Sequence, residues 1–107
     1  MKDYLFQASY TPEALTALIK APQNREDAIR PAIEKLGGKL KGAYFAFGEY
    51  DVVVLFSMPS DVEAGALALS VAASGGLKAS KTTPLMGMAD AVESIKKASG
   101  TGYKPPK

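Results

Sequence analysis

Cysteine, histidine and tryptophan are all absent from the 107-residue sequence. Without cysteine no disulfide can hold the fold together, which is compatible with a reducing compartment, so we expect a cytoplasmic protein. Without histidine the chain lacks the commonest general base, the usual nucleophilic triads and the typical zinc and iron ligand sets. Catalysis would have to use Asp, Glu, Tyr, Lys, Ser or Thr, and we expect no bound metal and no cofactor.

Long hydrophobic runs and strong charge are also missing. No stretch of about 18 apolar residues occurs, and the N-terminus leads into a short strand-like run instead of a signal-peptide core. We therefore expect no membrane association. The formal net charge is +2, and Arg25 and Arg30 are the only arginines. A nucleic-acid-binding surface usually needs a basic face with several arginines, so we expect no nucleic-acid partner.

The length suits one domain, which can bury a core of its own. We predict a single domain over residues 1–99 and a flexible tail over 100–107, where two glycines and two prolines argue against regular structure. Within the domain, apolar periodicity and turn residues predict strands at 3–10, 39–47, 51–57 and 77–83, and helices at 12–20, 25–36, 60–76 and 84–99.

Several helix boundaries carry local signals. Thr11 can cap the first helix, and Ser60 with Glu63 forms a capping box at the start of the third. The glycine pairs after the second and third helices can supply left-handed stops. Pro31 lies inside the second helix and lacks an N–H group, so we expect it to kink the helix or to restart it near Arg30.

The element order, apart from the terminal helix, is βαββαβ. This order predicts an α+β, ferredoxin-like fold with a four-stranded antiparallel sheet and its main helices on one face. The C-terminal helix is an addition to that fold.

Both faces of the predicted sheet are apolar. In the third strand Val52, Val54 and Phe56 point one way, while Val53 and Leu55 point the other. Helices cover only one face, and an apolar sheet face is not expected to stay in water. A second subunit, a ligand or the C-terminal helix could cover it. We favour a homodimer that closes sheet against sheet, with a trimer as the alternative.

The tetrapeptide GEYD ends the predicted hairpin and supplies the first candidate site. Gly48 is expected to serve the turn, where a positive φ is cheap only for glycine. Tyr50 either packs with its hydroxyl hydrogen-bonded or lines a cleft, and Asp51 either accepts backbone N–H groups or acts as a general base or cation ligand. We place the pocket at this strand end, with Tyr44 and Arg25 as further ligand-binding candidates.

Three segments of the chain together resemble the GYD domain, a family of small bacterial proteins: NREDAIRPAIEKLGGKL, FGEYDVVVLFSMPSD and ALALSVAASGGLKASKTT. The namesake residues of that family fall on Gly48, Tyr50 and Asp51, and the similarity covers roughly residues 3–83. The resemblance implies the dimeric α/β-barrel group of ferredoxin-like folds. It implies no particular reaction.

Three functions are compatible with these observations. An apolar sheet with several tyrosines and no catalytic constellation favours an oligomeric module that binds a small ligand or regulates a partner. The alternative is a cofactor-independent enzyme that acts on an apolar or aromatic small molecule, with Asp51 or Tyr50 in proton transfer. A purely structural interaction partner is the third.

Overall fold

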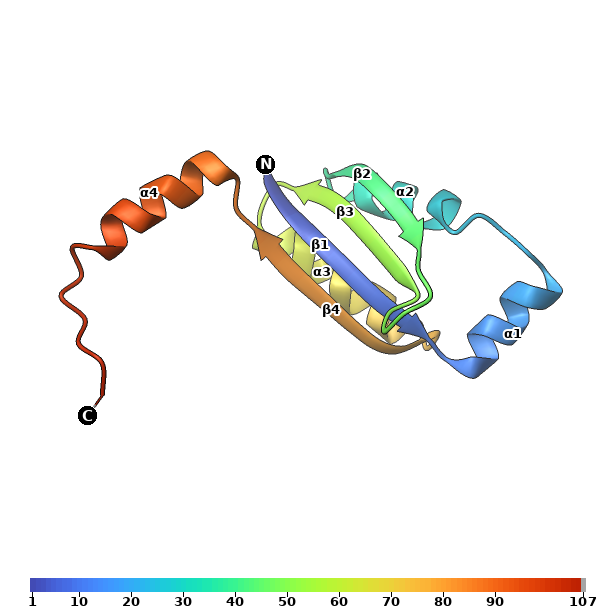
Figure 1. The fold of residues 1–107 in the computed structure, drawn as a ribbon. Coiled ribbons are helices and arrows are strands. Elements are labelled where there is room, and N and C mark those ends of the chain that lie inside the picture. The colour runs from blue at the N-terminus through green and yellow to red at the C-terminus, as the bar shows by residue number, and fades with distance from the viewer. Residues whose placement is uncertain (107) are drawn as a thin grey trace.

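A computed structural model describes residues 1–106, and residue 107 of the predicted tail lies outside the described residues. The fold is α+β, as predicted (Figure 1). Every predicted strand and helix is present, and residues 102–106 have no regular secondary structure. The elements are β1 Lys2–Tyr10, α1 Pro12–Lys20, α2 Glu26–Lys35, β2 Lys39–Phe45, β3 Val52–Met58, α3 Asp61–Ala73, β4 Leu77–Leu85 and α4 Met88–Ala98.

The four strands form one open sheet in the order β2-β3-β1-β4, and all three neighbouring pairs are antiparallel. The predicted antiparallel sheet and the predicted hairpin of β2 and β3 are therefore confirmed. In the two central strands Tyr4 lies opposite Phe56, and their rings stack with centroids 5.4 Å apart. Directly opposed residues share a face, so this register fixes which side chains point together.

We call the face of the sheet that carries α2 and α3 the covered face. Its buried side chains pack against Ile33 of α2 and against Ala64 and Leu67 of α3. These contacts form one hydrophobic core for the domain. The strand residues of that core are Tyr4, Phe6, Ala8, Leu40, Val54, Phe56 and Met58.

Most helix boundaries are where the local signals place them. Thr11 Oγ1 accepts the N–H of Ala14 at 3.1 Å, and Ser60 Oγ accepts the N–H of Val62 at 3.2 Å. Gly37 and Gly75, after α2 and α3, have φ angles of 85° and 86°. Thr11 and Ser60 are confirmed as caps, and the left-handed stops are confirmed. The predicted capping box is not formed as expected, because Glu63 accepts the hydroxyl of Ser60 and not its backbone N–H.

Two local predictions need correction. Helix α2 continues through Pro31, so of the two predicted outcomes, a kink or a restart near Arg30, the restart does not occur. The proline removes only one hydrogen bond of the helix, and the buried Ile33 holds the segment on the sheet. Gly48 does not have a positive φ. The connection between β2 and β3 spans residues 46–51, so six residues share the reversal and no tight two-residue turn is needed.

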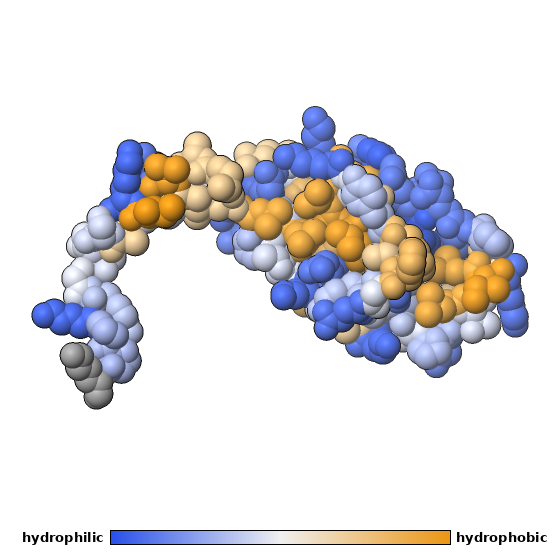
Figure 2. All heavy atoms as spheres, in the orientation of Figure 1, coloured by the Kyte–Doolittle hydropathy of each residue, from blue (hydrophilic) through white to orange (hydrophobic). Residues whose placement is uncertain are grey.

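The opposite face of the sheet, which we call the open face, carries no helix of residues 1–106. The C-terminal helix α4 extends away beyond the end of β4, so the alternative in which it covers its own sheet is wrong (Figure 1). Figure 2 shows apolar residues gathered over the strands in the same view. The register places on this face Leu5, Tyr44, Val53, Leu55, Thr83 and Leu85, together with the polar residues Asp3, Gln7, Ser57 and Lys81. The open face is therefore apolar only in part.

Candidate functional site

A cleft of about 790 Å³ lies over the covered face, bounded by α1, α2, α3 and the segment that joins α1 to α2. Its floor consists of apolar strand residues, and its walls are mostly apolar helix residues. Small-molecule sites commonly have this size and this lining, so the cleft is the candidate site. The floor includes Phe6, Ala8, Val52 and Val54, and the walls include Ala14, Leu18, Ile29, Ala32 and Val71.

The sequence creates the cleft through the placement of α1. This helix buries none of its residues, and Ile19 is 79% exposed. Its start is fixed to the domain, because the N–H of Thr11 donates to the carbonyl of Gly76 at 3.0 Å. Pro22 and its neighbours then carry the chain across to α2. Small residues such as Ala28 and Ser70 line the space between the elements, so the side chains leave it unfilled.

Charged and polar side chains lie where α2 begins. Arg25 Nη1 donates to Gln23 Oε1 at 2.8 Å, and within residues 1–106 Arg25 forms no ion pair. Glu26 is engaged elsewhere, because its Oε2 lies 2.5 Å from Nη2 of Arg30. The hydrogen bond that Arg30 donates to Glu26 raises the pKa of the Arg30 guanidinium above its usual range. The cleft thus has one guanidinium with no carboxylate partner.

The predicted site residues divide into two groups. Arg25 lines the cleft, and Tyr44 borders it at the β2 edge although the register turns its side chain to the open face, whereas Tyr50 and Asp51 do not line it. Tyr44 lies on the edge strand with its ring beside Gly42. Tyr50 is half-buried. The structure brings together only half of the predicted set, and sequence reasoning missed the wall formed by α1. Small residues face the cleft from both helices, Ala14 and Ala17 from α1 and Ala28 and Ala32 from α2, but alanines alone do not predict a cleft.

Asp51 joins the hairpin end to β1. Its Oδ2 accepts the N–H of Tyr10 at 2.9 Å, and its own N–H donates to the carbonyl of Ala8 at 2.8 Å. Its carbonyl accepts the N–H of Ala46 at 2.7 Å. The first of these bonds matches the interpretation in which the carboxylate accepts a backbone N–H group, and the other two are main-chain bonds that hold the same residue in place.

A family model described as the GYD domain matches residues 4–95. The chain belongs to the GYD domain family. The match takes in all four strands except Lys2 and Asp3 at the start of β1, includes the GEYD tetrapeptide and ends within α4. No curated protein matches the chain.

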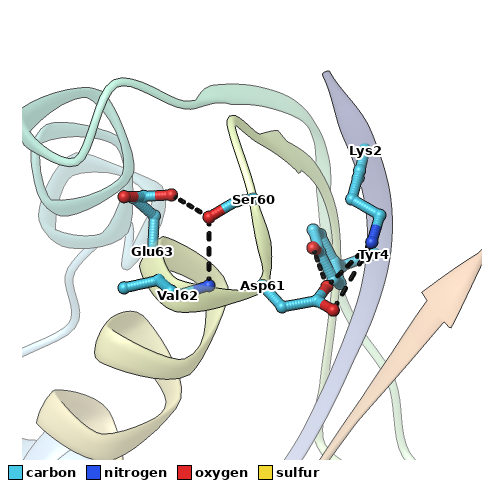
Figure 3. A network of polar contacts seen from close by, with 6 residues as sticks. All are labelled: Lys2, Tyr4, Ser60, Asp61, Val62 and Glu63. Atoms are coloured by element: carbon cyan, nitrogen blue, oxygen red, sulfur yellow. Dashed lines mark hydrogen bonds and ion pairs between the residues drawn. The ribbon is translucent and has the colours of Figure 1, made fainter.

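This GYD domain has a second polar cluster, at the end of the sheet where α3 begins (Figure 3). The hydroxyl of Tyr4 donates to Asp61 Oδ1 at 2.5 Å, and Lys2 Nζ lies 3.3 Å from the same oxygen. Burial and then the hydrogen bond to Asp61 raise the pKa of Tyr4 to about 12. The same contacts, from Tyr4 and then Lys2, hold the pKa of Asp61 below its usual range.

These shifts favour a structural role for the cluster. A tyrosine with a raised pKa keeps its proton at neutral pH, so Tyr4 is a poor general base. Ser60 Oγ, the cap of α3, also donates to Glu63 Oε1 at 2.6 Å beside it. The cluster therefore attaches the start of α3 to β1. Among residues 1–106 no group of three acidic side chains is placed to share a metal ion, and no helix is long and apolar enough to cross a bilayer.

Proposed function

We propose that this GYD domain binds a small apolar or aromatic molecule in the cleft over the covered face. The observation that carries the proposal is the 790 Å³ cleft, whose floor is apolar and rigid because it is the sheet itself. Neither Tyr50 nor Asp51 lines the cleft, and Glu26, the carboxylate that does, is paired with Arg30. This placement favours binding over the alternative of a cofactor-independent enzyme.

A substitution that fills the cleft tests this function. Ala28 is exposed and lines the cleft, so Ala28→Trp should place an indole in the binding space without disturbing the core. The matched control is Glu34→Trp, an exposed position on the same helix outside the lining. The uncharged probe N-phenyl-1-naphthylamine should bind the wild type and Glu34→Trp, with an affinity at least about tenfold weaker for Ala28→Trp. Equal binding by all three proteins would contradict the proposal.

The proposed functional unit is a homodimer, with a trimer as the alternative. The accessible surface is 7571 Å², about 1,900 Å² above the roughly 5,700 Å² typical of a folded monomer of this mass. The radius of gyration is 17.1 Å, against about 13 Å for a compact domain of this length. A standard interface buries about 800 Å² per partner, so the excess surface is large enough for a stable dimer.

The open face is the proposed contact between subunits. Two open faces packed together would give a dimeric α/β barrel built from two ferredoxin-like units, and the strand order β2-β3-β1-β4 supports that architecture. Sedimentation velocity at micromolar concentration tests the assembly. A purely monomeric protein under those conditions would contradict it.

A further inference from the structure

Charge is unevenly distributed around the cleft. Two of the residues that line it are charged, and they are the neighbours Arg25 and Glu26. They do not neutralise each other, because the carboxylate of Glu26 pairs with Arg30, which lies one helical turn further along and outside the lining. Arg25 contacts only the amide oxygen of Gln23 among the charged and polar side chains of residues 1–106. A guanidinium has five N–H donors, so most of those on Arg25 remain available.

The first turn of α2 has no free backbone N–H group that could bind an anion in place of Arg25. The N–H of Glu26 donates to Asn24 Oδ1, and that of Asp27 donates to the carbonyl of Asn24. The N–H groups of Ala28 and Ile29 both donate to the carbonyl of Arg25. An anion in this part of the cleft would therefore be held by the Arg25 side chain and not by the helix N-terminus.

An apolar floor beside one available guanidinium selects a particular kind of ligand. A neutral hydrocarbon would leave Arg25 unused, and a small inorganic anion would leave the floor over Phe6 and Val54 exposed to water. A guanidinium binds carboxylates and sulfonates through charge-assisted hydrogen bonds. Building on the proposed function, we propose that the cleft binds an amphipathic anion, with its apolar body on the sheet and its anionic group on Arg25.

A matched pair of probes separates the two parts of this recognition. The probes are 8-anilinonaphthalene-1-sulfonate and N-phenyl-1-naphthylamine, which share an apolar skeleton and differ in the sulfonate. The variant is Arg25→Ala, which should fold normally because Arg25 is exposed and its side chain does not cap the helix. The control is Lys35→Ala, which removes the same charge from an exposed position of α2 outside the cleft.

We expect Arg25→Ala to weaken binding of the sulfonate at least about tenfold and to leave binding of the neutral probe unchanged, because only the charge-assisted contact is lost. Lys35→Ala should leave both affinities at wild-type values. Ala28→Trp should weaken both, since it fills the shared site. Raising the ionic strength should weaken binding of the sulfonate probe more than binding of the neutral probe.

The outcomes that overturn the inference differ from those that overturn the proposed function. If Arg25→Ala binds both probes like the wild type, the ligand is not an anion held by Arg25, while the cleft still stands as a binding site. If Lys35→Ala weakens the sulfonate as much as Arg25→Ala does, the effect is one of net charge and the inference fails. If neither probe binds the wild type, both proposals fail together.

Discussion

The two faces of the sheet use the same strands, yet their side chains and surroundings differ. On the covered face Val54 is 2% exposed under the helices, whereas Leu55, the next residue along β3, is 37% exposed on the open face. An antiparallel sheet with helices on one side commonly alternates apolar and polar residues. Strand β1 alternates in this way, with Asp3 and Gln7 on the open face, whereas β3 is apolar on both faces from Val52 to Phe56. The open face therefore keeps an apolar centre, and the proposed dimer would cover it.

Placing a carboxylate on the covered face should have the largest effect. In Val54→Asp the new group would lie in the core with no cation or hydrogen-bond donor positioned for it, at a cost of several kcal/mol. That cost is comparable with the whole stability of a small domain, about 5–15 kcal/mol. We expect an unfolded protein by circular dichroism. A native spectrum with a cooperative thermal transition would show that the covered face is not the core.

The same substitution one residue earlier tests the open face. Val53→Asp places its carboxylate beside Gln7 and Tyr44, away from α2 and α3. The domain should stay folded, while the proposed dimer should dissociate because a charge would be trapped among Leu5, Leu55 and the apolar residues of the second open face. Sedimentation velocity measures the association, and circular dichroism measures the fold. If Val53→Asp forms a dimer as readily as the wild type, the contact between subunits does not lie on the open face.

Local signals explain why so much of the fold could be predicted. Period-two apolar residues located the strands, and residues such as Thr11 and Ser60 fixed where helices begin, because a cap acts on the backbone within three residues of itself. The sequence pattern of β3 also separated the two faces of the sheet, since Val54 is buried with the core and Val53 points away.

The candidate site depended on long-range packing and could be predicted only in part. Nothing local to α1 indicates that it packs at the edge of the domain and leaves a cleft, so Ala14 and Leu18 were not expected there. Gly38 is a second example. It was expected only as a helix stop, yet a Cβ at this position would lie 2.4 Å from the carbonyl oxygen of Ser57, so its role is close approach to β3.

A smaller effect on stability is expected at the hairpin end of the sheet, where Asp51 lies. Asp51→Ala removes the acceptor for the N–H of Tyr10 and should lower the free energy of unfolding by about 1–2 kcal/mol, measured in urea. Binding of N-phenyl-1-naphthylamine should be unchanged, because Asp51 does not line the cleft. Tyr50→Phe serves as the companion variant and should change neither quantity. Normal stability with lost probe binding in Asp51→Ala would reverse this assignment and make the carboxylate functional.

An effect that is absent at neutral pH concerns Tyr4, a residue of the covered face that is 2% exposed. Burial and the hydrogen bond to Asp61 raise the pKa of its hydroxyl to about 12 in the folded chain, from the usual 10.0. Because the folded pKa is the higher one, the protonated phenol stabilises the fold fully below pH 10, and this contribution is lost as the pH rises from about 10 to 12. Urea titrations across that interval should show a steeper loss of stability for the wild type than for Tyr4→Phe. Tyr44→Phe removes a hydroxyl from the open face, where the residue is 63% exposed, and should retain the wild-type slope. Parallel curves for the wild type and Tyr4→Phe would mean that the Tyr4 hydroxyl ionises as readily in the folded protein as in the unfolded chain. Tyr4 on the covered face and Tyr44 on the open face would then not differ in how folding affects their ionisation.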